Sequence, residues 1–396
     1  MTQRPHLILH IGAPKCGSSA LQTALSMTPD LRGSDGTRYR YTSAHLLAGA
    51  WRVQDGTTLT TGARLSPYGY TSWPNLGPQY PAADIFAALK QTLTQGEKRG
   101  YVPIASNEGW INHHAAFAAA LADWGHPPVD VVVFLRPPID WVNAAFWQWG
   151  VWHQPQLDVW MERSGMPYSF ADDIAAWSRI PNVRLTVRSQ RPDVVAKFAA
   201  LYDLPLKAEL QANTSSPAIL TGFLLRNRSF RPTGHQGAIE FVVQRWCPPV
   251  PGRKLWAVQA RHVQALRPVR LAALDTLRAV LSPEDQADLF ADTRWTREAP
   301  YHADILEGVM KLNDPTLFAP LYHALREGAE AAARVAGKPM PQLPDCPPEG
   351  ADIATYDAAI FPVLETLQDM DAAVRQQTVP RWKRTAFAWA SRLKRG

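Results

Sequence analysis

The chain contains little cysteine. Its 396 residues include only Cys16, Cys247 and Cys346, without a Cys-x-x-Cys pair. An odd number without such a pair argues against a disulfide framework and against a thiolate zinc site. We therefore expect a protein of a reducing compartment, the cytoplasm.

A long apolar run is also missing. No stretch approaches the roughly 18 consecutive apolar residues that a membrane span requires. The run from Leu7 to Gly12 is too short for the apolar core of a signal peptide. These two absences predict a soluble chain.

Charged residues are scarce, at 19%, whereas hydrophobic residues make up 46%. That composition supports a sizeable core and excludes global disorder. Lys and Arg outnumber Asp and Glu by 41 to 35, but the whole excess lies in residues 381–396. The rest of the chain carries no net charge, so we expect no binding of nucleic acid.

Strand and helix patterns alternate over the first half of the chain. The run at 129–135 is β-branched, which is typical of a strand buried on both faces of a parallel sheet. We predict an α/β fold, a parallel sheet flanked by helices with a helical C-terminal annex. The predicted strands are 6–11, 101–105, 129–135 and 183–187, and the predicted helices of this half are 19–25, 82–93, 115–124, 139–149 and 193–202.

The predicted organisation has a core, an annex, a linker and a tail. Residues 34–82 show no sustained period, which indicates an irregular excursion or lid within the core. The predicted parts are the α/β core at 1–210, a helical annex of the same domain at 211–337, a Pro-rich linker at 338–350 and a basic helical tail at 351–396.

A glycine-rich loop follows the first predicted strand. It reads Gly12-Ala13-Pro14-Lys15-Cys16-Gly17-Ser18-Ser19, and its G-x-x-x-x-G spacing between strand and helix is that of a P-loop, which cradles phosphate. We therefore expect the sheet to be P-loop-like. An ATP- or GTP-binding loop has a lysine after the second glycine. Here that position is Ser18, and the lysine of the loop is Lys15 at its apex.

Lys15, Glu108 and Arg136 each follow a predicted strand. Ligands of open α/β sheets bind outside the carboxyl ends of the strands. A nucleoside triphosphatase needs an aspartate at the end of a neighbouring strand to hold magnesium. Here the clearest predicted strand, 129–135, is followed by Arg136 instead. The trio suits transfer of a group from an anionic nucleotide donor to a hydroxyl or amine, and no metal is expected.

Several strings then resemble one family. His10–Gln22 resembles the 5′-phosphosulfate loop of sulfotransferases that use 3′-phosphoadenosine 5′-phosphosulfate (PAPS). Val131–Asp140 is similar to the family's 3′-phosphate element, and Ile104–Glu108 to the strand that ends in Ser-x-Glu in bacterial members. His45 after the first helix and the unit ending Phe198–Leu204 match bacterial carbohydrate-type members. The resemblance covers roughly residues 5–320; its first loop is highly specific, and it is weak after residue 210.

The resemblance implies a role for each strand-end residue. Lys15 would stabilise charge on the bridging oxygen of the leaving phosphate, while loop amides cradle the 5′-phosphate. Glu108 or His45 would accept the proton of the acceptor. The implied donor-binding residues are Pro14, Lys15, Cys16, Gly17, Ser18, Ser19, Arg136 and Asn143.

One position departs from the family pattern. The family carries a serine eight residues after the arginine, where this chain has Ala144. Asn143 precedes it, about 100° around a helix, and does not simply replace the serine. The departure bears on the strength of PAPS binding.

Other interpretations of these residues stand beside the functional ones. Glu108 could cap the next helix, and His45 could be a surface histidine. Cys16 could be a small residue in a tight loop, with a thiol pKa lowered by the helix N-terminus. A tryptophan-rich stretch could stack on sugar rings or form a packed aromatic core; its members are Trp141, Trp147, Trp149, Trp152 and Trp160.

The sequence thus predicts a PAPS-dependent sulfotransferase with a hydroxyl or amine acceptor on a glycan, lipid headgroup or small molecule, a glycan or lipid-linked glycan being favoured. Two alternatives remain. One is a non-catalytic protein of the same fold that binds glycan or nucleotide, suggested by Ala144. The other is a P-loop nucleotide kinase or hydrolase, which would depend on magnesium.

The basic tail allows two interpretations. Its tryptophans share one face of a predicted helix with six bases around them, so the helix could lie on the inner face of the membrane. Alternatively, the same face could dock on the body of the protein. The residues of the face are Trp382, Ala386, Trp389 and Leu393, and the bases are Arg381, Lys383, Arg384, Arg392, Lys394 and Arg395.

Overall fold

The computed structural model describes residues 4–47, 50–164, 168, 170–207, 216–307 and 311–378. Its strands are β1 (Leu7–His10), β2 (Asp30–Arg32), β3 (Arg38–Leu47), β4 (Ala50–Gln54), β5 (Val102–Ser106), β6 (Val129–Leu135) and β7 (Val183–Ser189). They form one sheet in the order β2-β3-β5-β1-β6-β7, with β4 paired to β3.

The centre of the sheet is parallel. Strands β3, β5, β1, β6 and β7 run in one direction, and only β2 and β4 pair antiparallel with β3. Strand β1 has β5 on one side and β6 on the other, so the carboxyl ends of these three strands meet at one edge. Because the chain order reverses around β1, this edge is where an open α/β sheet binds its ligand.

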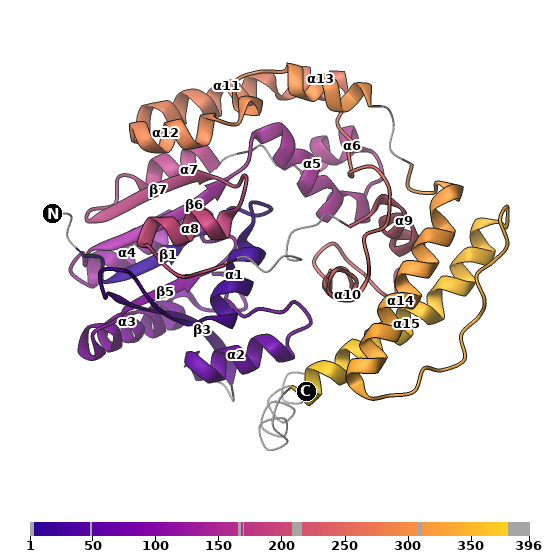
Figure 1. Cartoon of the computed structure of the whole chain (residues 1–396). Helices are drawn as coiled ribbons and strands as arrows, with labels where there is room; N and C mark the ends of the chain where they lie inside the picture. The colour runs from indigo at the N-terminus through magenta and orange to yellow at the C-terminus, as the bar shows by residue number, and fades with distance from the viewer. Residues whose placement is uncertain are drawn as a thin grey trace.

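Helices flank the sheet and continue beyond it (Figure 1). In the first half they are α1 (Ser18–Met27), α2 (Gly56–Leu65), α3 (Ala82–Arg99), α4 (His114–Asp123), α5 (Pro138–Gln148), α6 (Leu157–Ser164), α7 (Phe170–Trp177) and α8 (Val194–Tyr202). The C-terminal helical region contains α9 (Ala218–Arg226), α10 (Ala238–Trp246), α11 (Ala260–Val280), α12 (Pro283–Phe290), α13 (Ala299–Leu306), α14 (Phe318–Ala336) and α15 (Ile353–Gln377).

These elements confirm the α/β class, the mostly parallel sheet and the helical C-terminal region. The four predicted strands correspond to β1, β5, β6 and β7, and the strand predicted at 129–135 has the bounds of β6. Among the described residues, no helix is both long and apolar enough to cross a membrane.

The prediction of an irregular excursion over 34–82 is wrong for its central part. Residues 38–65 form β3, β4 and α2, and β3 is a parallel member of the sheet. Its buried residues include polar ones whose hydroxyls form hydrogen bonds in the interior of the protein. Thr42 Oγ1 donates to the carbonyl of Ile104 at 3.2 Å and accepts from Trp73 Nε1 at 3.2 Å. Such satisfied polar residues remove the apolar pattern by which a buried strand is recognised.

The last two described helices form a parallel pair. Phe318 and Tyr356, near their starts, stack at 5.1 Å, and Gln377 Nε2 at the end of α15 donates to the carbonyl of Ala336 at 2.6 Å. The connection over 338–350 contains no helix or strand and runs back along the pair (Figure 1). The start of the predicted tail is therefore docked on α14. The proposed membrane helix at 381–396 lies outside the described residues.

Candidate functional site

The loop after β1 has an unusual backbone. Lys15 and Gly17 have φ angles of 62° and 95°, in the left-handed region. A side chain on Gly17 would place its Cβ 2.7 Å from Val194, so only glycine fits there. Lys15 adopts this conformation without being glycine, and such strain is kept where the surroundings impose it, often at functional sites. The conformation sets Lys15 at the apex of the loop.

The start of α1 faces the loop with backbone N–H groups. Gly17 is its N-cap and offers no side chain to satisfy them. Among the described residues, the buried hydroxyl of Ser18 also has no hydrogen-bond partner. At Gly12 an added Cβ would lie 2.5 Å from that hydroxyl. The N–H groups of a helix N-terminus, this hydroxyl and a close backbone make a cradle suited to a phosphate or sulfate group.

Glu108 lies beside this loop, as the strand ends predicted. The backbone N–H of Lys15 donates to Glu108 Oε1 at 3.4 Å, and Gly109 N donates to the carbonyl of Gly12 at 2.8 Å. Burial raises the pKa of the Glu108 carboxyl, although the charge and N–H of Lys15 oppose it. A carboxylate with a raised pKa next to a cation is suited to accepting a proton near neutral pH.

In the Ser-x-Glu string, Ser106 has a structural role, whereas Glu108 carries the chemical group. His10 Nδ1 and Ser106 Oγ lie 2.7 Å apart, and Gln22 Nε2 donates to the same hydroxyl at 3.0 Å. Burial lowers the pKa of His10 to about 3, so the imidazole is neutral. Ser106 thus links β1, β5 and α1 and fixes the turn that presents Glu108.

Lys15 reaches across to α5. Its Nζ donates to Gln148 Oε1 at 3.0 Å. Burial lowers the pKa of Lys15, the carboxylates of Glu108 and Glu240 oppose that effect, and Arg136 and Arg231 add to it. The amine therefore stands among two acids and two bases from four different segments.

Arg136 follows β6, on the other side of β1. Its Nη2 donates to Gln190 Oε1 at 3.2 Å. Its buried Nε, like the buried Oδ2 of Asp140, has no hydrogen-bond partner among the described residues. Burial lowers the pKa of this guanidinium. A buried N–H without a partner at a strand end is where an anionic ligand can supply the missing acceptor.

Asn143 has a role that the sequence did not predict. Its Nδ2 donates to the carbonyl of Leu255 at 3.0 Å, and its Oδ1 accepts from the N–H of Ala257 at 2.8 Å. The side chain thus holds residues 255–257 against α5. Its predicted contact with the donor stays a prediction and would have to share these atoms. Ala144 is the next residue of α5 and is half-buried.

His45 lies on β3. The last pairing of that strand with β5 joins Thr42 to Ala105, and His45 follows it by three residues. Its Nε2 is 3.5 Å from Ser43 Oγ. β5 separates β3 from β1 in the sheet. His45 is therefore placed toward the same edge of the sheet, and Glu108 contacts the loop through the N–H of Lys15.

Cys16 differs from its predicted reactivity. The sequence placed it at a helix N-terminus, which would lower its pKa, but burial raises the pKa of the thiol to about 12. Arg136 and Lys15 pull in the other direction with smaller effect. Cys16 is a buried residue of the loop, 1% exposed, and its thiol is not activated.

The tryptophan-rich stretch packs into the core. Trp141, Trp152 and Trp160 are buried, and Trp141 Nε1 donates to the carbonyl of Pro14 at 2.8 Å. Trp160 packs on Phe146 with ring centroids 5.8 Å apart. These contacts support the aromatic-core interpretation and show that one tryptophan braces the loop.

Sequence reasoning also missed Tyr70. Burial raises its pKa to about 12, and the nearby hydroxyl of Ser19 opposes that effect. Its ring centroid lies 6.2 Å from that of Phe241 on α10. No local pattern announced these contacts, because Tyr70 lies between elements and meets α1 and α10 only in the folded chain.

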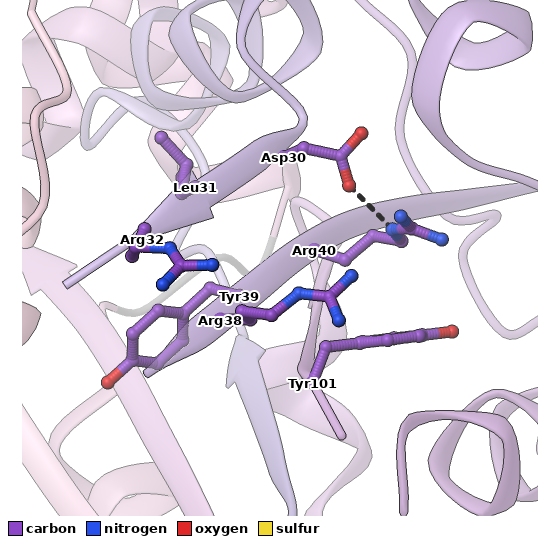
Figure 2. Close-up of a pocket in the computed structure, with 7 residues that line it drawn as sticks. All are labelled: Asp30, Leu31, Arg32, Arg38, Tyr39, Arg40 and Tyr101. Atoms are coloured by element: carbon purple, nitrogen blue, oxygen red, sulfur yellow. Dashed lines mark hydrogen bonds and ion pairs between the residues drawn. The ribbon is translucent and has the colours of Figure 1, made fainter. Parts of the chain in front are cut away.

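Figure 2 shows a pocket elsewhere in the fold. Its lining includes the start of β3 and Tyr101, which precedes β5. It therefore lies at the amino end of the parallel strands, opposite the loop. Arg40 there is already paired with Asp30 at 2.6 Å and with Asp55 at 3.1 Å, and lies 4.8 Å over the Tyr101 ring. We assign it no role.

Comparisons of the chain with protein-family models, with curated proteins and with solved structures find no match. The site combines a phosphate cradle, a lysine at its apex, a carboxylate beside that lysine and an arginine at the next strand end. The cradle and the arginine can bind an anionic donor, the carboxylate can accept a proton, and the lysine can stabilise a leaving oxyanion.

Proposed function

We propose that the chain transfers a sulfuryl group from PAPS to a hydroxyl or amine. The observation that carries the proposal is the meeting of Lys15, Glu108 and Arg136 at the adjacent carboxyl ends of β1, β5 and β6. The resemblance of the loop to the 5′-phosphosulfate loop supplies the identity of the donor. A glycan or lipid-linked glycan stays the favoured acceptor.

The site contains groups that fit such a donor. The cradle at Gly12, Gly17 and Ser18 offers N–H donors and a hydroxyl without a partner among the described residues. The buried Nε of Arg136 suits a second phosphate. The backbone therefore suits the 5′ side of the donor, and Arg136 suits the 3′-phosphate.

The reaction divides between Glu108 and Lys15. Glu108 accepts the proton of the acceptor O–H or N–H, whose electron pair forms a new bond to sulfur. The bond from sulfur to the bridging oxygen breaks, and that oxygen leaves on the phosphate with the electron pair. Lys15 stabilises the negative charge that develops there. The products are the sulfated acceptor and 3′,5′-adenosine diphosphate (PAP).

The direct test is release of PAP by the purified full chain. We expect release from PAPS to depend on an added acceptor from a panel of glycans, lipid-linked glycans and alcohols, and to persist in a chelator of divalent cations. Magnesium-dependent release of phosphate from ATP would instead favour a kinase or hydrolase. Stabilisation by PAP without turnover on any acceptor would favour the non-catalytic alternative.

The pH–rate profile of turnover should be bell-shaped. Glu108 must be ionised to accept a proton, and its pKa is raised, so activity is lost on acidification at a higher pH than for an ordinary carboxyl. Lys15 must be protonated, and its pKa is lowered, so activity falls on the alkaline side before an ordinary lysine would titrate. Steady-state rates across pH measure both limbs. An acid limb that survives Glu108→Gln in a still active enzyme would contradict the assignment of the base.

Restoring the family serine at Ala144 should strengthen PAP binding. A hydroxyl that donates to a charged phosphate contributes about 1.5 to 3 kcal/mol. Calorimetric titration of wild type and Ala144→Ser with PAP measures the difference, and Ala118→Ser on α4 is a control for an added hydroxyl. Equal or weaker binding by Ala144→Ser would place the 3′-phosphate elsewhere.

A further inference from the structure

Gln148, the last residue of α5, holds the side chain of Lys15. Its Oε1 accepts from Lys15 Nζ at 3.0 Å, and its Nε2 donates to the carbonyl of Gly234 at 3.0 Å. A carbonyl can only accept, so the amide nitrogen must face Gly234. The amide oxygen is thereby directed at Lys15, and a flipped amide would lose both bonds.

A buried ion pair of the helical region supports Gln148. Arg231 Nη2 donates to the backbone carbonyls of Gln148 at 2.8 Å and Gly234 at 3.0 Å. Its Nη1 is paired with Glu240 Oε2 at 2.6 Å. The Arg231 side chain is 1% exposed and lies 4.4 Å over the ring of Trp152. Arg231 therefore fixes both the main chain of Gln148 and the carbonyl that its side chain uses.

A neutral acceptor at this point has a chemical advantage. An amide oxygen orients an ammonium group without cancelling its charge, whereas a carboxylate in hydrogen-bonding contact would form an ion pair with it. The charges of Glu108 and Glu240 favour the charged form of Lys15, whereas the charges of Arg136 and Arg231 disfavour it. The lysine stays directed while its charge remains available to a leaving oxygen.

We infer that Gln148 is a positioning residue for Lys15, and that the buried Arg231–Glu240 pair holds Gln148 in place, so that the helical region aims the loop lysine. The catalytic consequence rests on the proposed sulfuryl transfer. The contact itself does not, because it is a property of the protein without donor or acceptor.

The contact is tested by the titration of Lys15 in the full chain. The probe is the ¹³Cε resonance of Lys15 in protein labelled at lysine, assigned by its loss in Lys15→Arg. Gln148→Met keeps the length of the side chain but removes its acceptor. Because a hydrogen bond to the charged form raises the pKa of an amine, Lys15 should titrate at lower pH in Gln148→Met than in wild type. Gln156→Met, on an exposed residue that precedes α6, is the matched control and should leave Lys15 unchanged.

Turnover tests the positioning role in the same variants. We expect Gln148→Met to lose about ten- to a hundredfold in kcat, as misdirected catalytic groups do, with the Kd for PAP changed less than about threefold. In Gln148→Glu, Lys15 should titrate at higher pH than in wild type, because a carboxylate favours the charged form of the amine. This variant should also lose turnover.

The outcomes separate the two proposals. Unchanged titration of Lys15 in both Gln148 variants would overturn the inference, as would normal turnover by Gln148→Met. If the titration of Lys15 shifts in the Gln148 variants while the wild-type protein transfers no sulfuryl group to any acceptor, the proposed function is overturned and the contact is still supported.

Discussion

Lys15→Ala is expected to lose about 10²- to 10³-fold in kcat, equivalent to about 2.7 to 4 kcal/mol of barrier stabilisation, the typical cost of removing one donor to a developing oxyanion. The reason is that the charge of Lys15 matters most when the leaving oxygen becomes negative. The Kd for PAP, measured by calorimetry, should change much less, because the backbone cradle and Arg136 remain. Turnover is measured as PAP release at saturating PAPS.

Two controls accompany this variant. Lys90→Ala removes an exposed lysine of α3 that pairs with Asp123 at 3.2 Å, and it should leave turnover unchanged. Thermal unfolding shows whether Lys15→Ala still folds, since residue 15 sits in a left-handed conformation that alanine also adopts at a cost. A folded Lys15→Ala protein with near wild-type turnover would remove Lys15 from the mechanism.

Arg231→Met is expected to produce the largest loss of stability, about 3 to 5 kcal/mol, because removing one member of a buried ion pair leaves the other charge without a partner. Here the remaining charge is Glu240, whose side chain is 14% exposed and, among the described residues, keeps only the hydroxyl of Ser216, at 2.8 Å. The carbonyls of Gln148 and Gly234 also each lose the bond from Arg231. Equilibrium unfolding in urea, followed by tryptophan fluorescence, measures the change.

Arg228→Met is the matched control for this loss. Arg228 is exposed, lies 5.4 Å over the same Trp152 ring and donates to the Trp152 carbonyl at 2.8 Å. Its removal should cost much less than the removal of Arg231, as expected for surface residues. If both variants lose the same free energy of unfolding, the ion pair of Arg231 with Glu240 stabilises the fold no more than the contacts of a surface arginine do.

The parts of the fold that were predictable carry local signals. Residues 129–135 predicted β6 because six of the seven are β-branched or apolar, and all seven are buried in the sheet. The glycine spacing of the loop predicted the turn at Gly17, whose backbone is left-handed, and the fold adds a second reason for glycine because a Cβ there would lie 2.7 Å from Val194. Strand β3 carried no such signal, because Thr42 is buried with its hydroxyl bonded inside the sheet, and a buried polar residue resembles a loop residue in the sequence.

For the candidate site, the sequence by itself determined which chemical groups stand at strand ends, since each follows a recognisable element: Lys15 in a glycine-spaced loop, Glu108 after β5 and Arg136 after β6. Only the tertiary structure decided that Gln148 receives the amine of Lys15, 133 residues away in the chain, and that Asn143 holds residues 255–257. The physical reason is range. Helix and strand patterns arise from neighbours within a few residues, whereas a buried polar side chain is satisfied by whichever donor or acceptor the packing of distant elements brings to it.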